Sequence, residues 1–145
     1  MNNRDILETW FRRVWLEEDL SAIDDMMAAD APVHGLEKSP HVGPADFKAF
    51  AGALLTHITD TSISIDEYME NGNQVSLLMN VSAKCRKTGK PVQMFGLAMC
   101  RIVDGKIVQA HNYADFMGLF EQLGVLPADA MQKCLCGEAL GTAQK

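Results

Sequence analysis

The stretch Gly96–Gly124, GLAMCRIVDGKIVQAHNYADFMGLFEQLG, decides the fold that this sequence predicts. The pair Asp104-Gly105 separates two strand-like apolar segments, and Asp-Gly is a strong signal for a tight hairpin turn. The residues 116–123 then carry apolar side chains at helical spacing, and Gly124 is a typical helix end. The order strand, turn, strand and helix leaves one carboxylate, Asp115, where the last strand stops.

The residues before this stretch predict helices first and strands afterwards. Apolar side chains recur at helical spacing up to about residue 18, over about 20–27, and after Gly43. From about residue 59 the period changes to two, with turns at Glu70-Asn71-Gly72-Asn73 and Thr88-Gly89-Lys90-Pro91. A meander of antiparallel strands after helices predicts an α+β layer fold, with the early helices covering one face of the sheet. Leu78, on an otherwise polar strand face, hints that the second face is also buried, in a dimer.

Length and charge limit the classes of function. The chain has 145 residues, which predicts one domain over 1–127 and a short helix with a frayed tail over 128–145. Lys and Arg number 13 against 19 Asp and Glu, a formal charge of −6, so we expect no nucleic-acid partner and no anionic membrane. No apolar run reaches the length of a membrane span, and the N-terminus lacks a signal-peptide pattern, so we expect a cytoplasmic protein.

The four cysteines do not predict a metal centre. Cys85 and Cys100 lie in strand-like apolar segments, where a free thiol acts as a small hydrophobe. Cys134 and Cys136 lack the spacing that is usual between zinc ligands, and no second pair follows. We therefore expect neither a metal nor a cofactor.

Several segments follow one another in the order of a known family. They are GPADF at 43–47, GNQV at 72–75, TGKPV at 88–92, RIVDGKIV at 101–108, DFMGL at 115–119 and QLG at 122–124. On these segments the chain resembles the nuclear transport factor 2-like superfamily over about residues 5–127, and most of all its SnoaL-like polyketide cyclase branch, related in fold to ketosteroid isomerases. The resemblance implies a cone-shaped, curved antiparallel sheet wrapped around N-terminal helices, with an apolar cavity at the open end. It also implies homodimers formed through the sheets.

Asp115 has two interpretations. The resemblance implies a general base, because characterised cyclases of this branch use an aspartate on the last strand. An apolar cavity raises the pKa of a carboxyl group, and a base tuned in this way can remove a proton from carbon next to a carbonyl. The alternative comes from the residues alone: Asp115 directly precedes a helix and suits its N-cap. The two roles are compatible.

Two histidines and a tyrosine are candidate partners of Asp115. Strict alternation, barring a bulge, places five residues on one face of the last strand: Ile107, Gln109, His111, Tyr113 and Asp115. His111 and Asp115 would then lie about 13 Å apart, too far for contact. Tyr113 lies between them and can donate a hydrogen bond to a substrate oxyanion, although a core aromatic is the simpler explanation. His34 ends a segment that packs near the cavity in relatives.

The expected site therefore has catalytic and binding members. The catalytic candidates are Asp115, His34 and His111, and the candidates for substrate binding are Tyr113, Trp15, Met79, Met99 and Phe50. Core packing is the simpler explanation for the tryptophan, and the methionines line the core or the cavity rather than carry chemistry. The family pairs its aspartate with a histidine on the preceding strand, and this sequence has none between His57 and His111. That departure weakens the expectation of aldol cyclisation.

Three functions remain open. The leading hypothesis is a cofactor-independent cyclase or isomerase in which Asp115 abstracts a proton from an apolar carbonyl compound. The second is a non-catalytic module that binds an apolar small molecule. The third is a dimerisation or accessory domain without a ligand.

Overall fold

The chain begins with helices, as the spacing of its apolar residues predicts; the computed structural model describes residues 1–141. The first helix, α1 (Asn3–Trp10), starts with a capping box in which Asn2 and Asp5 each accept a hydrogen bond from the other's backbone N–H. It continues as a π-helical segment, η1 (Phe11–Leu16), and a short helix follows, α2 (Ser21–Met26). The sequence predicts these helices but not the π-helical turn.

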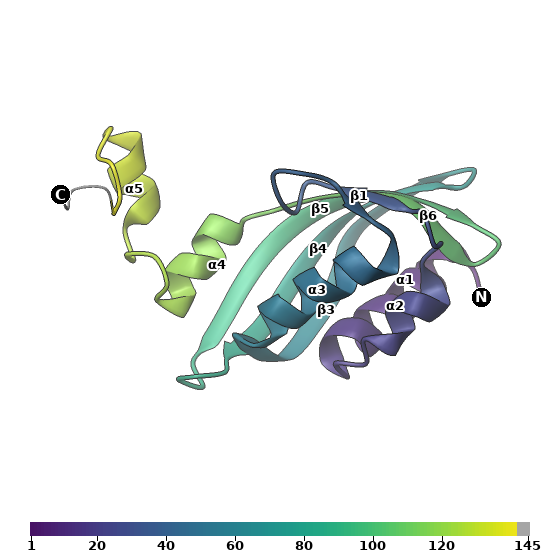
Figure 1. The fold of residues 1–145 in the computed structure, drawn as a ribbon, viewed down its shortest axis with the longest axis horizontal. Helices are drawn as coiled ribbons and strands as arrows, with labels where there is room; N and C mark the ends of the chain where they lie inside the picture. Colours follow the sequence, from purple (N-terminus) through teal and green to yellow (C-terminus); the bar gives the residue numbers. More distant parts are fainter. Residues whose placement is uncertain (142–145) are drawn as a thin grey trace.

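A longer helix, α3 (Gly43–Leu55), lies beside them. Pro44 suits its first turn, where a backbone N–H has no partner in the helix. Phe47, Ala51 and Leu55 form its buried stripe. The helix lies beside the sheet (Figure 1), and Phe47 of this stripe belongs to the core and to a pocket wall, so α3 forms one wall of the interior.

The strands form one six-stranded sheet in the order β2-β1-β6-β5-β4-β3. Their bounds are β1 (Pro32–His34), β2 (His41–Val42), β3 (Ile58–Asn71), β4 (Gln74–Cys85), β5 (Pro91–Val103) and β6 (Lys106–Ala114). The strands β3 to β6 form an antiparallel meander, and β1 pairs with β6 in parallel. Gly72 and the pair Asp104-Gly105 have positive φ, as the predicted tight turns require.

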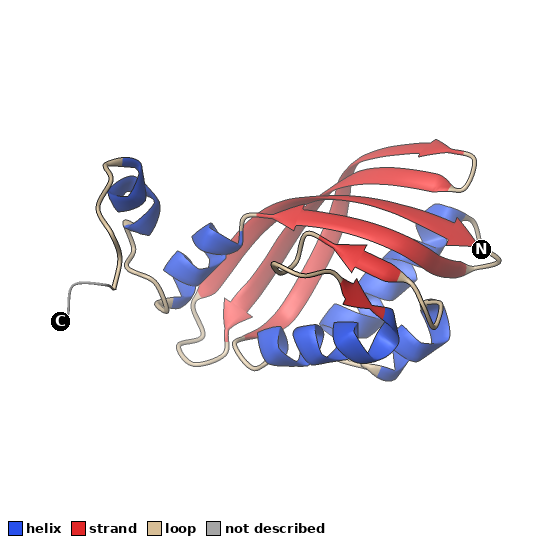
Figure 2. Ribbon diagram, turned by 45° about the horizontal axis from the view of Figure 1, so that its top comes forward, coloured by secondary structure: helices blue, strands red, loops and turns tan. Residues whose placement is uncertain are grey.

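The sheet is curved, does not close on itself, and has the helices α1, α2 and α3 on one face (Figure 2). Along β4, buried and more accessible residues alternate, so one face of the strand meets the helices. The most deeply buried side chains include Val14, Ile23, Ile58 and Val75. The expected α+β fold, a curved antiparallel sheet packed against the early helices, is confirmed.

Two helices follow the last strand. The first, α4 (Phe116–Leu123), ends at Gly124 with φ of 79°, and the second, α5 (Ala130–Leu135), lies beyond α4 at the end of the molecule (Figure 1). The helix expected near the C-terminus is present, whereas part of the expected frayed tail, residues 142–145, lies outside the described residues. Within residues 1–141, no helix has both the length and the apolar character needed to span a membrane.

Candidate functional site

A pocket of about 110 Å³ lies between the helices and the concave face of the sheet. Its walls come from α1, η1, α3, α4 and the strands β3 to β6, and they are almost entirely apolar. The polar side chains among the described lining residues are Thr61, Gln93 and Asn112, and none of these lining residues is charged or a histidine. The pocket therefore suits an apolar ligand with few hydrogen-bonding groups.

A row of aromatic rings joins the helices around this pocket. The Phe47 ring lies 5.4 Å from Trp10 and 6.4 Å from Trp15, measured between ring centroids. Phe50 continues the row and meets Phe116 edge to face at 6.0 Å. Because Phe116 and Leu119 of α4 line the pocket, α4 closes the end of the pocket beyond α3.

A pair of hydrogen bonds attaches α4 to the sheet. The side-chain oxygen of Gln122 accepts from the backbone N–H of Gln93 at 2.8 Å, and its Nε2 donates to the Gln93 carbonyl at 2.8 Å. Gln122 thus bonds to β5 as a neighbouring strand would. This attachment holds α4 beside the N-terminal part of β5.

Asp115 joins the last strand to this helix. Its backbone N–H donates to the Phe95 carbonyl at 3.2 Å, and its Oδ1 accepts from the Gly118 N–H at 2.9 Å. The side chain is therefore the N-cap of α4; it is exposed and does not line the pocket, although both neighbours, Ala114 and Phe116, do. A Cβ at Gly118 would lie 2.3 Å from Asp115 Oδ2, so a glycine at 118 leaves room for the cap.

A β-bulge changes which residues of β6 face the pocket. Arg101 pairs with Gln109 while the next residue, Ile102, pairs with Ile107, so Val108 is an extra residue in β6. The expectation from strict alternation is wrong beyond this point. Ala110, Asn112 and Ala114 line the pocket, whereas His111 and Tyr113 lie on the opposite face of the sheet.

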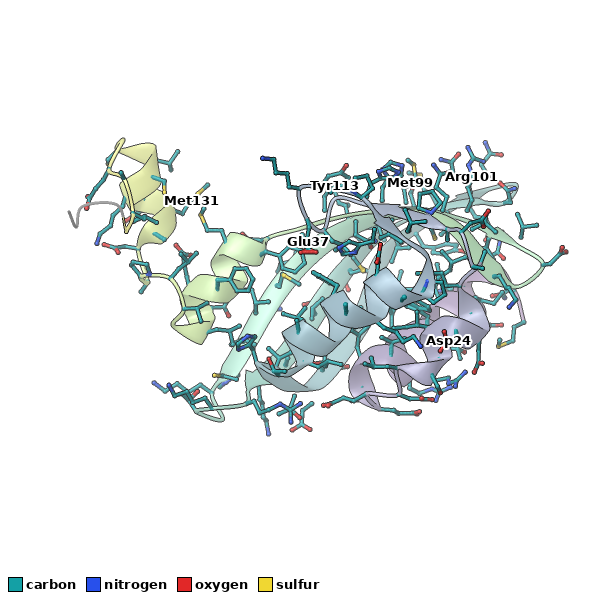
Figure 3. All side chains as sticks on the ribbon, in the orientation of Figure 1. Asp24, Glu37, Met99, Arg101, Tyr113 and Met131 are labelled. Carbon is teal, nitrogen blue, oxygen red and sulfur yellow. The ribbon has the colours of Figure 1, made fainter. Side chains whose placement is uncertain are left out.

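Tyr113 and Met99 stand with Arg101 on the face turned away from the helices (Figure 3). The Tyr113 side chain is 59% exposed, and neither it nor Met99 lines the pocket, contrary to the expected placement. His34 and His111 are cross-strand neighbours whose rings stack at 4.6 Å, and neither belongs to the pocket wall. The structure thus brings the two histidines together, but outside the pocket.

Three of the expected binding residues do line the pocket: Trp15, Phe50 and Met79. Cys100 also lines it, and burial raises the pKa of its thiol to about 11. Cys100 therefore stays protonated near neutral pH and contributes a small apolar surface. Within residues 1–141, no group of three or more His, Cys, Asp or Glu side chains is placed to hold a metal ion.

Sequence reasoning missed the polar residues of the pocket. Counting back by twos from Ile65 and Ile63 on the buried face of β3 reaches Thr61, so the signal for Thr61 was present. Alternation along β6 alone does not place Asn112 in the pocket, because the bulge that turns it inward depends on pairing between strands. Outside this pocket wall, His41 is also buried, and its Nε2 lies 2.6 Å from Glu37 Oε2.

The SnoaL-like polyketide cyclase family model matches residues 5–123 of the chain. The protein belongs to this family. A search of curated proteins finds no match. The match includes α4 and its capping residue Asp115, and it stops before α5.

Solved structures with the same fold agree with this assignment. A protein from Acidithiobacillus ferrooxidans, provisionally named a polyketide cyclase, is 20% identical with a TM-score of 0.70, and the match covers 86% of this chain and 99% of that one. IdmH from Streptomyces antibioticus, named in the same provisional way, is 19% identical with a TM-score of 0.70 and the same coverages, 86% and 99%. A protein from Catenulispora acidiphila with a ketosteroid isomerase-like fold, solved in complex with trimethylamine, is 17% identical with a TM-score of 0.72, and the match covers 88% of this chain and 98% of that one. At these identities the likeness establishes the fold.

Proposed function

We propose that this SnoaL-like protein is a cofactor-independent cyclase or isomerase that binds an apolar carbonyl compound in the pocket and uses Asp115 as its general base. The observation that carries the proposal is the position of Asp115 between Ala114 and Phe116, two residues of the pocket wall. The family match and the apolar lining of the pocket support the proposal.

The chemistry requires one base and one bound ketone. The Asp115 carboxylate takes the proton from carbon next to the carbonyl, and the electrons of the broken C–H bond form the enolate, whose charge rests on oxygen. Return of the proton at another carbon completes an isomerisation, and attack of the enolate carbon on a second carbonyl closes a ring. His34 of β1 and His111 and Tyr113 of β6 lie outside the pocket wall, so the proposal gives them no step.

Asp115 has to turn from its cap to reach a ligand. In the structure its Oδ1 accepts the Gly118 N–H, and loss of such a cap costs about 1 kcal/mol. That cost is small beside the effect of a positioned base, which contributes about 10²–10⁴-fold in rate. Capping and catalysis are therefore compatible as alternate positions of one side chain.

Solvent deuterium exchange tests the base without knowledge of the natural substrate. Phenylacetone is an apolar one-ring ketone, and NMR in D₂O follows the loss of its protons next to the carbonyl. The native protein is expected to accelerate this exchange over buffer. Asp115→Asn and Asp115→Ser keep an N-cap residue but lack the carboxylate, so both are expected to lower the catalysed rate by about 10²-fold or more.

Asp104→Asn is the matched control, because Asp104 is an exposed turn residue with φ of 52°, a conformation that Asn tolerates. It should exchange phenylacetone at the native rate. Native exchange by Asp115→Asn would show that Asp115 is not the base.

The second candidate is a non-catalytic module that binds an apolar small molecule. The absence of charged side chains and histidines among the described residues of the pocket wall favours it. In that case the native protein binds phenylacetone, Asp115→Asn leaves the affinity unchanged, and exchange is no faster than in buffer.

A further inference from the structure

We propose that the hydroxyl group of Thr61 binds an oxygen atom of the ligand on the β3 side of the pocket, away from Asp115 at the end of β6, and so fixes the ligand's orientation. The inference rests on the proposed function, because it takes the ligand to be an apolar carbonyl compound held in this pocket. It adds the group that recognises the oxygen and the part of the pocket in which the oxygen lies.

The first observation is an unpaired buried hydroxyl. Thr61 is 1% exposed and lines the pocket, and its Oγ1 has no hydrogen-bond partner among the described residues. Buried polar side chains in folded proteins almost always have a partner, and each exception calls for an explanation. A ligand oxygen that accepts the Thr61 O–H supplies the missing partner.

The second observation is the backbone that places this hydroxyl. Thr59 pairs with Lys84 and Ser62 with Ser82, so β3 carries one extra residue between these pairs. Asp60, inside this bulge, has φ of 52°, a left-handed conformation that is uncommon for a residue other than glycine. Ile58 and Thr61 are an odd number of positions apart, so strict alternation would place them on opposite faces of β3. Because of the bulge, both side chains are buried. Bulges often redirect a side chain near a binding site.

The surroundings of Thr61 favour an organic ligand over a water molecule. Ile58, Ile63 and Ala83, the pocket residues nearest to it on β3 and β4, are apolar. A buried water needs two to four polar partners, and these side chains supply none. A ligand with an apolar body and an oxygen atom at this position satisfies the hydroxyl and fills the apolar space as well.

The other polar side chains of the wall are less suited to this role. Gln93 donates its Nε2–H to Asn80 at 2.9 Å. Asn112 is only half-buried and lies on β6, with β5 and β4 between it and β3. Thr61 is therefore the deeply buried polar group of the pocket.

Pocket size sets the choice of probes. A volume of about 110 Å³ is close to that of an engineered cavity of about 150 Å³ that binds benzene, so a one-ring compound is a suitable probe. Acetophenone and ethylbenzene have nearly the same shape, and only acetophenone carries a carbonyl oxygen. Their dissociation constants can be measured by NMR titration of the isotopically labelled protein.

The experiment measures the dissociation constant of each probe for the native protein and for two variants of Thr61. The native protein is expected to bind acetophenone more tightly than ethylbenzene. Thr61→Val, of nearly the same shape, is expected to weaken acetophenone binding about 5-fold while ethylbenzene binds at least as tightly as before. Thr61→Ser keeps the hydroxyl and is expected to retain the preference for acetophenone.

The outcomes separate this inference from the proposed function. If both probes bind but Thr61→Val weakens them equally or not at all, the role of Thr61 is wrong and the pocket remains a binding site. If neither probe binds the native protein, both the pocket as a binding site and the role of Thr61 are overturned.

Discussion

The buried hydroxyl of Thr61 lowers the folding stability, because no other described residue forms a hydrogen bond with it. Leaving such a buried group unpaired costs about 1–3 kcal/mol of folding stability. Asp60, the residue before it, adds backbone strain at φ of 52°. Strain and unpaired polar groups that persist together are typical of positions kept for binding rather than for stability.

Thr61→Val is therefore expected to stabilise the protein in the absence of ligand. Removal of an unpaired hydroxyl should add about 1 kcal/mol, which raises Tm by about 3 °C for a domain of this size. Thermal and urea denaturation measure the change.

Thr56→Val is the control, because the Thr56 hydroxyl already donates to the Ala53 carbonyl at 2.6 Å, so its removal gives no gain. Destabilisation of the Thr61→Val protein by 1 kcal/mol or more would show that the Thr61 hydroxyl has a partner in the free protein.

At the scale of elements, α4 is a part of the pocket wall that few contacts hold in place. The Gln122 side chain holds it to β5, and Leu119 is its one buried side chain among those described. Elements with few buried contacts open most readily. A ligand larger than one ring would therefore enter most easily by displacement of α4.

Gln122→Ala is expected to loosen this end of the pocket. The two hydrogen bonds to Gln93 are lost, and a typical hydrogen bond contributes about 1 kcal/mol, so the Gln93 amide should exchange with solvent about 10-fold faster or more. Hydrogen–deuterium exchange measured by NMR gives the rate at each amide. Gln132→Ala, at an exposed position of α5, should leave the Gln93 amide unchanged. An unchanged exchange rate in Gln122→Ala would show that other contacts hold α4.

The sequence was sufficient to predict the longer helices and strands, but not the π-helical turn η1, the short strand β2 or the faces that the strands present. Turns at Asn71-Gly72 and Asp104-Gly105, and caps at Asn2 and Gly124, follow from local conformational preferences. The bulge at Val108 depends on how β6 pairs with β5, which the alternation within β6 does not reveal, so alternation alone gives the wrong face for His111 and Tyr113. The N-cap role of Asp115 was predictable, because it depends only on the adjoining helix.

At the scale of the whole molecule, one face of the sheet carries an apolar patch. Phe95, Leu97, Met99 and Tyr113 of β5 and β6 form this outer patch, and Leu97 is 60% exposed. Clustered exposed apolar side chains are typical of an interaction surface. We propose that the patch is the contact surface of a homodimer formed through the sheets, in agreement with the hint from Leu78, which pairs with Leu97 across β4 and β5.

Leu97→Lys is expected to separate such a dimer, because it places a charge at the centre of the buried surface. Light scattering coupled to size-exclusion chromatography should give a dimer mass for the native protein and a monomer mass for the variant. Leu135→Lys is the matched control, since Leu135 is 75% exposed on α5 and away from the sheet. A monomer mass for the native protein would contradict the proposal. A dimer that Leu135→Lys separates and Leu97→Lys does not would also contradict it.

The bulge in β6 has a consequence for how this pocket can evolve. After the bulge, the residues of β6 alternate between the two faces of the sheet. Ala110, Asn112 and Ala114 face the pocket, and His111 and Tyr113 face away from it. Moving the bulge past these residues would exchange the two sets without altering a single side chain. The sequence of β6 could therefore provide a second pocket lining. In that lining the imidazole of His111 and the phenol of Tyr113 would replace the amide of Asn112 and the methyl groups of the two alanines. In this fold an insertion or deletion can change the chemistry of the pocket in one mutational event, where point substitutions would need several.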